Sequence, residues 1–121
     1  MPNCLDDVSW GSKVPRNGTT EKGQFKITNP LSGGFFEGKF KDDNGPTEDI
    51  YGHCSAASIW FLRPASSPIY RYSGNFIYVG SEKRYIDGTR TLVRADSEAI
   101  ERKQAVLPLP PGDDWEGDKG T

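Results

Sequence analysis

Three segments of this chain place a glycine between two bulky residues in the same alternating arrangement. They are Phe36 to Phe40, Ile50 to Cys54 and Tyr72 to Phe76, each with glycine at its centre. In a strand the first, third and fifth residues share one face, so each segment leaves a gap between two large side chains. Glycine weakens a strand, so its repeated use indicates a tight bend or the close approach of another group. A sheet that curls into a small barrel needs such bends.

Glycine and proline interrupt the sequence at short intervals, and the runs between them have the length of strands. Strands are expected at residues 23–28, 34–41, 48–54, 57–63, 69–79, 83–86 and 89–95. Because turn-length links join these runs and no helical run separates them before Asp96, the pattern predicts an antiparallel meander. Aromatic residues are 12% of the chain and all apolar residues only 34%, a balance that favours strands. The expected fold class is all-β, a small antiparallel meander β-barrel of seven or eight strands.

The segment after the last expected strand departs from this pattern. Residues 96–106 fit a short helix with a polar N-terminal cap, and an alternating edge strand is the other interpretation. Residues 107–111 contain three prolines that cannot donate to a sheet, so the barrel domain is expected to span residues 1–111. Residues 112–121 are acidic and rich in glycine, which predicts a flexible tail, although Trp115 could dock back onto the domain.

The composition argues against several partners. With 15 basic and 17 acidic residues the formal charge is -2, so nucleic acid is not an expected partner. No window approaches the roughly 20 apolar residues of a membrane span, and the N-terminus lacks the apolar core of a signal peptide. A soluble, cytoplasmic protein with no membrane partner is therefore expected. His53 is the only histidine, and no motif indicates a metal or a cofactor, so neither is expected.

Two sequence features allow more than one interpretation. Cys4 and Cys54 are the only cysteines, and they can form one disulfide or remain free thiols. Free thiols are slightly favoured, because a small scaffold that depends on disulfides usually carries more cysteines. Asn17, Gly18 and Thr19 match a glycosylation sequon, but Asn-Gly is also a favoured turn. The turn is the preferred interpretation.

Aromatic residues supply the candidate ligand site. Between residues 69 and 78, alternation places Tyr70, Tyr72, Phe76 and Tyr78 on one face, beside a glycine gap. Such tyrosines can line a cavity, since each ring offers an apolar body and a hydroxyl group, but they can also be plain core. The expected ligand-binding residues are Phe36, Phe40, Trp60, Tyr70, Tyr72, Phe76, Tyr78 and Tyr85.

Three residues are candidates for catalysis: His53, Arg63 and Tyr72. His53 and Cys54 cannot act together as base and nucleophile, because adjacent residues of a strand point to opposite faces. An outward-facing polar residue is the simpler interpretation of His53. An arginine such as Arg63, if turned inward beside the tyrosines, would bind a carboxylate or stabilise an enolate-like charge.

The strand segments between residues 23 and 94 resemble, in order, the strand sequence of the avidin and streptavidin family of calycin-like up-and-down barrels. The segments that carry the resemblance are Gly23 to Thr28, Gly34 to Phe40, Ile50 to Cys54, Ser58 to Leu62, Tyr72 to Phe76 and Thr89 to Arg94. The resemblance implies a barrel with a ligand-sized mouth. The family's binding tyrosine falls on Phe40, and its binding tryptophans fall on Tyr72 and near Thr91, so biotin is not the expected ligand.

The expected function is the binding of a small organic molecule in an aromatic-lined cavity, by a monomer or a homo-oligomer. The alternative is a cofactor-independent enzyme, an isomerase or cyclase, in which tyrosine and arginine stabilise developing charge and His53 or a carboxylate moves protons. A third possibility is a protein-interaction or inhibitor module that acts through loops and the proline-rich segment. An inward arginine or acid in a closed cavity favours the enzyme, a tyrosine-lined cavity the binding protein, and a filled barrel the interaction module.

Overall fold

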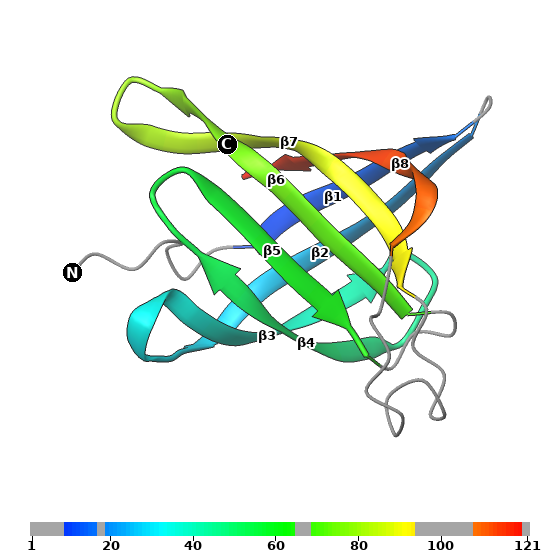
Figure 1. The fold of residues 1–121 in the computed structure, drawn as a ribbon, viewed down its shortest axis with the longest axis horizontal. Helices are drawn as coiled ribbons and strands as arrows, with labels where there is room; N and C mark the ends of the chain where they lie inside the picture. Colours follow the sequence, from blue (N-terminus) through cyan, green and yellow to red (C-terminus); the bar gives the residue numbers. More distant parts are fainter. Residues whose placement is uncertain (1–8, 17–18, 65–68, 94–107, 120–121) are drawn as a thin grey trace.

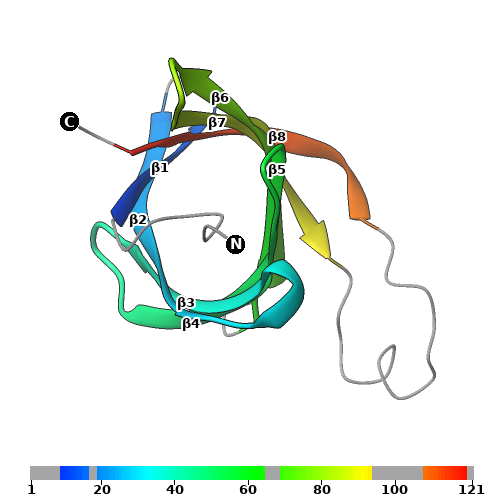
Figure 2. The same cartoon turned by 90° about the vertical axis from the view of Figure 1, so that its left-hand side faces the viewer.

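The computed structural model describes residues 9–16, 19–64, 69–93 and 108–119. They form the strands β1 (Ser9–Arg16), β2 (Thr19–Pro30), β3 (Phe35–Asp42), β4 (Thr47–Cys54), β5 (Ser58–Arg63), β6 (Ile69–Val79), β7 (Glu82–Val93) and β8 (Pro108–Asp118). Each strand pairs antiparallel with the next along the chain, and β8 pairs with β1, so the sheet closes into a barrel (Figures 1 and 2). The predicted meander barrel is confirmed, with eight strands.

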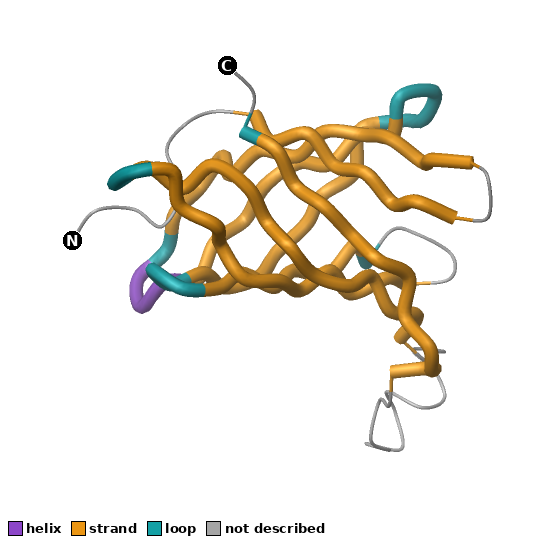
Figure 3. Tube along the Cα trace, turned by 90° about the horizontal axis from the view of Figure 1, so that it is seen from above, coloured by secondary structure: helices purple, strands orange, loops and turns teal. Residues whose placement is uncertain are grey.

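Regular helix is almost absent from the described ranges. The 3-10 turn η1 (Ser32–Gly34) is the helical segment drawn there, at the end of the barrel where β2 turns into β3 (Figure 3). No helix in the described parts of the chain is long and apolar enough to cross a membrane. The segment 96–106, for which a short helix or an edge strand was expected, lies outside the described residues.

Alternation along the strands places one set of side chains inside the closed sheet. In β3, for example, Phe36 and Phe40 are buried while Glu37 and Lys39 face solvent. The interior of an eight-stranded barrel is just wide enough for side chains to fill it or for one small ligand. The buried apolar residues are Trp10, Val14, Phe25, Ile27, Phe36, Phe40, Ile50, Cys54, Ile59, Phe61, Tyr72, Phe76, Ile86 and Trp115.

The glycines of the three repeated segments lie where a neighbouring strand leaves no room for a side chain. A Cβ atom on Gly38 would lie 2.3 Å from the carbonyl oxygen of Lys26, and one on Gly52 would lie 1.9 Å from that of Trp60. Gly74 is paired with Gly88 of β7 across the strands. The interpretation of these glycines as sites of close approach is therefore confirmed. The approaching group is the backbone of the adjacent strand.

We expect Gly52→Ala to lower the free energy of unfolding by about 1–3 kcal/mol, because the strands must separate to admit the methyl group. Gly11→Ala is the matched control, since its Cβ would meet the carbonyl oxygen of Asp118 at an ordinary 3.4 Å. It should change stability by no more than about 0.5 kcal/mol. Urea unfolding followed by tryptophan fluorescence compares the two variants, and equal losses would contradict the crowding explanation.

The structure corrects the sequence prediction at both ends of the chain. The strand β1 was not expected, although its residues Trp10, Ser12 and Val14 alternate inward. The predicted boundary after residue 111 and the flexible tail from 112 are wrong, because β8 runs through both and Trp115 is fully buried. β1 pairs with residues 116–118 of β8, away from the prolines, so their missing N–H groups do not interrupt that ladder.

The break that the sequence predicted between residues 86 and 89 is wrong. Asp87 and Gly88 do not end a strand, because Gly88 pairs with Gly74 inside the continuous strand β7. Asn17 and Gly18 lie outside the described residues, but Arg16 and Thr19 on either side are paired with each other.

Cys54 is buried and disulfide-bonded. The slight preference for free thiols is therefore wrong for Cys54, and Cys4 lies outside the described residues.

Candidate functional site

Five of the eight residues expected to bind a ligand lie inside the barrel: Phe36, Phe40, Tyr70, Tyr72 and Phe76. Their rings contact one another and further aromatic rings that the sequence prediction did not include. Phe61 stacks on Tyr72 with ring centroids 4.8 Å apart, and Trp115 meets Tyr72 edge-on at 5.3 Å. These distances are those of packed aromatic pairs. The interior aromatic residues therefore form the core of the barrel.

The other three expected ligand-binding residues are not in the buried interior, and their assignment to a cavity is corrected: Trp60 and Tyr85 face outward, and Tyr78 is exposed. Trp60 points outward because Phe61, its neighbour in β5, points inward. Tyr78 is exposed near the end of β6, and its hydroxyl donates to the carbonyl oxygen of Ala56 at 2.6 Å. The bulge beside it lies in β7, where Arg84 is the extra residue. Tyr85 is exposed because Ile86 occupies the interior.

Two arginines and a tyrosine form a buried polar layer inside the barrel, which we call the arginine layer: Arg63, Tyr72 and Arg90. Arg63 Nη1 donates to the Tyr72 hydroxyl oxygen at 3.1 Å, and the charge of Arg90 also acts on the pKa of Tyr72. Both arginines are buried: Arg63 is 4% exposed and Arg90 is 3% exposed. Each also lies over an aromatic ring, Arg63 over Phe40 at 4.2 Å and Arg90 over Tyr70 at 4.1 Å.

Carboxylates neutralise both arginines of this layer. Arg63 Nη2 pairs with Asp42 at 3.0 Å and with Glu48. Arg90 pairs with Glu21 at 2.6 Å through Nη1 and with Asp113 at 2.9 Å through Nη2. Buried charges require such partners, since an unpaired buried charge costs several kcal/mol.

The ionisation states of the arginine layer follow from burial and from these partners. Burial raises the pKa of Tyr72 above its ordinary value, and Arg63 and Arg90 lower it by less, so the phenol is neutral at pH 7. For both arginines burial acts to lower the pKa, but their partners outweigh it and raise the pKa, so both stay charged. The arrangement therefore offers a neutral phenol between two compensated cations, which is a poor source of protons for catalysis.

His53 is separate from this layer. It is partly exposed on the outer face of β4, where its Nε2 lies 2.8 Å from the carbonyl oxygen of Gly33 and its ring meets Phe35 edge-on. The three catalytic candidates are thus only partly brought together, since Arg63 contacts Tyr72 and His53 lies on the other face of the sheet. Among the described residues no three His, Cys, Asp or Glu side chains gather in an arrangement that could hold a metal ion.

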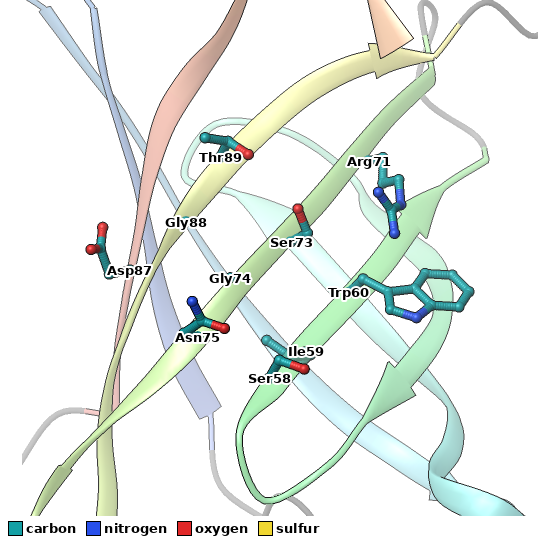
Figure 4. A pocket seen from close by; sticks show the side chains of 10 residues that line it. All are labelled: Ser58, Ile59, Trp60, Arg71, Ser73, Gly74, Asn75, Asp87, Gly88 and Thr89. Carbon is teal, nitrogen blue, oxygen red and sulfur yellow. The ribbon is translucent and has the colours of Figure 1, made fainter. Parts of the chain in front are cut away.

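A groove lies on the outer face of β5, β6 and β7 (Figure 4). Its volume is about 400 Å³, and its residues are Ser58, Ile59, Trp60, Arg71, Ser73, Gly74, Asn75, Asp87, Gly88 and Thr89. The paired glycines Gly74 and Gly88 bring β6 and β7 close together in the middle of the groove. The outward side chains around them form three rows across the strands. One row is Ser58, Asn75 and Asp87, the next is Trp60, Ser73 and Thr89, and Arg71 lies in the third.

The polar side chains of this groove are not used elsewhere in the described fold. Those of Ser58, Arg71, Ser73, Asn75, Asp87 and Thr89 make no hydrogen bond or ion pair with another described residue. The arginine layer differs, because the Nη atoms of both arginines are bonded to carboxylates and Arg63 is also bonded to Tyr72. Of these groove residues, the sequence prediction included only Trp60 as a ligand contact, and it placed Trp60 in the cavity. The alternation of Arg71, Ser73 and Asn75 opposite the tyrosines was the available signal for the groove.

The comparisons with known proteins do not test the resemblance to the avidin family, which still rests on the strand segments alone. No protein-family model, curated protein or solved structure matches this chain significantly.

Proposed function

We propose that this barrel is a non-catalytic binding protein whose small polar ligand lies in the outer groove of β5, β6 and β7. The observation that carries the proposal is the concave set of polar side chains that have no partner among the described residues. Small-molecule sites are clefts of roughly 300–1,000 Å³ that are lined mainly by apolar and aromatic side chains, with a few placed polar groups. The groove has the volume and an aromatic residue, Trp60, but it is open and its lining is mostly polar, which favours a polar ligand.

The interior offers less support for ligand binding. The ring of Phe61 contacts those of both Phe25 and Tyr72, with ring centroids 5.0 Å and 4.8 Å apart. A ligand among these rings would have to displace core contacts, each of which contributes to stability. The small organic ligand expected from the sequence is therefore kept, and its proposed place moves from the interior to the outer face.

The enzyme hypothesis has one feature in its favour, the inward Arg63 beside Tyr72. An arginine that stabilises developing negative charge must have donors directed at the reacting atoms. The Nη donors of Arg63 and Arg90 are instead directed at carboxylates and, for Arg63, at Tyr72, which is only 1% exposed. We therefore propose binding without catalysis.

The disulfide bond of Cys54 indicates the kind of cellular compartment in which the protein works. Disulfides persist in oxidising compartments and are rare in the reducing cytosol. We accordingly propose an oxidising compartment in place of the cytoplasmic location expected from the sequence.

Native mass spectrometry of the protein isolated from its own organism tests the proposal. We expect a retained small-molecule mass on the wild-type protein, and its loss from Ser73→Trp, in which an indole fills the groove without entering the core. Thr47→Trp is the matched control, because Thr47 is exposed on β4 outside the groove. It should retain the ligand.

Two results would contradict the proposed function. Equal retention by Ser73→Trp would place the ligand elsewhere, and the barrel interior would then be the first alternative. Conversion of the released compound by the purified protein would favour the enzyme, and Tyr72→Phe would then test the role of the phenol.

A further inference from the structure

One wall of the groove is a guanidinium group stacked on an indole. The Cζ atom of Arg71 lies 5.4 Å from the ring centroid of Trp60, and Figure 4 shows the two side chains next to each other on β6 and β5. Stacking orients the guanidinium group without using its N–H donors. Because Arg71 has no hydrogen-bond or ion-pair partner for this group in the described ranges, its donors are available to a ligand.

The opposite end of the groove carries an amide and a carboxylate. Asn75 of β6 is paired across the strands with Asp87 of β7, and both side chains are exposed. An amide offers donors and an acceptor, and a carboxylate offers two acceptor oxygens. Adjacent hydroxyl groups on a sugar ring each donate and accept, so one planar side chain can bond both members of such a pair.

Two hydroxyl groups lie between these ends. Ser73 and Thr89 are paired across β6 and β7, beside the glycine pair. Arg71 and Asn75 are four residues apart on β6, which corresponds to about 13 Å along a strand. A ligand that reaches both ends must therefore be elongated and must carry polar groups along its length. Two or three linked sugar rings have this form.

The charges around the groove favour a neutral ligand. Arg71 and Asp87 carry opposite charges at its two ends. On β8, Glu116 is paired with Asp87 and Asp114 with Thr89, and both acidic residues are exposed. Lys13 of β1 is paired with Glu116 and offsets one of these charges, but Asp87, Asp114 and Glu116 still leave this end of the groove negative. It would repel a phosphate or a polyuronate more strongly than a neutral molecule.

We infer that the ligand of the groove is a neutral oligosaccharide of two or three sugar units, held by Arg71 at one end and by Asn75 and Asp87 at the other. The inference rests on the proposed function, since it names the class of ligand for the same groove. Trp60 contributes by orienting Arg71 and by offering its partly exposed ring to the C–H face of a sugar.

An NMR titration of the ¹⁵N-labelled full chain tests this inference with named probes. The neutral sugar probes are maltotriose, cellotriose, mannotriose and triacetylchitotriose. Trigalacturonic acid is the anionic probe, and triglycine is a zwitterionic probe that is not a sugar. We expect at least one neutral trisaccharide to shift the amide signals of residues 73–75 and 87–89 in a saturable way. Trigalacturonic acid should bind at least tenfold more weakly than that trisaccharide.

Variants matched in charge distinguish the loss of a direct contact with the ligand from a general change in charge. Arg71→Ala and Asp87→Asn should each weaken binding of the neutral trisaccharide at least fivefold. Arg84→Ala removes an arginine that lies over Tyr85, 5.8 Å from its ring centroid, outside the groove. Glu116→Gln removes the same charge as Asp87→Asn from the neighbouring strand. Both controls should change affinity less than twofold.

The contrary results are distinct from those of the proposed function. Groove binding of triglycine or trigalacturonic acid, with none of the neutral sugars, would overturn the carbohydrate assignment and leave the groove as the binding site. If no probe shifts the groove signals, the carbohydrate assignment also fails. Whether the groove is the binding site is tested separately, by native mass spectrometry of the isolated protein and of Ser73→Trp.

Discussion

Replacing Trp115 with alanine should lower the free energy of unfolding by about 3–5 kcal/mol, the range for the loss of a buried aromatic side chain. Trp115 is fully buried in β8, and its ring contacts those of Phe25, Phe61 and Tyr72. Its indole Nε1 also donates to the hydroxyl oxygen of Ser12 on β1 at 2.9 Å. The substitution therefore removes core volume and a hydrogen bond between the two strands that close the barrel.

Trp60→Ala is the matched control, because it removes the same side chain from the outer face of β5. It should cost less than about 1 kcal/mol, since little core volume is lost. Urea unfolding monitored by circular dichroism measures both variants without relying on tryptophan fluorescence. Similar small losses for the two would mean that residues 112–118 form a tail that the barrel does not need, as the sequence predicted.

The fold was predictable because its main signals are local. Alternation and turn residues marked β3 to β6 to within one residue at each end, as the expected ranges 34–41, 48–54, 57–63 and 69–79 show. The strand β8 could not be read this way, since its prolines argue against a sheet and only the closure of the barrel shows that they lie away from the β1 ladder. Trp115 could be assigned to the core only once that closure was known.

The candidate site was less predictable, because it depends on which face of each strand points inward. A shift of one residue moves every side chain of a strand to the other face. In β5 the aromatic neighbours Trp60 and Phe61 fit either choice, and the sequence alone did not decide between them. The outer groove also requires that β5, β6 and β7 be neighbours in register, which brings Arg71, Asn75 and Asp87 together only in the folded sheet.

Replacing Arg63 with methionine should lower the free energy of unfolding by about 3–5 kcal/mol, the cost of removing one partner from a buried ion pair. The side chain of Arg63 is 5% exposed, and that of its partner Glu48 is 13% exposed. Glu48 would then keep a largely buried charge without its guanidinium partner. Lys39→Met is the matched control, because the pair of Lys39 and Asp49 is exposed and should contribute no more than about 1 kcal/mol.

A double variant separates the charge from the packing. Arg63→Met combined with Glu48→Met replaces the buried pair by apolar side chains, and such replacements are often neutral or stabilising. We expect it to recover at least half of the loss, since the other carboxylate partner, Asp42, is half exposed and can be solvated. Urea unfolding of the two single variants and the double variant gives the coupling energy of Arg63 and Glu48 directly. A double variant as unstable as Arg63→Met would show that packing, not charge, causes the loss.

The same double variant distinguishes structure from function in the arginine layer. Under conditions where it is fully folded, it should retain the ligand of the wild-type protein, because the outer groove and the arginine layer lie on opposite faces of the sheet. Native mass spectrometry measures that retention. Loss of the ligand from the folded double variant, with retention by Ser73→Trp, would place the site inside the barrel, next to Tyr72, and would restore both the cavity and the enzyme hypotheses. Retention by the double variant, with loss from Ser73→Trp, would leave the arginine layer a structural element that holds the barrel closed around a filled core.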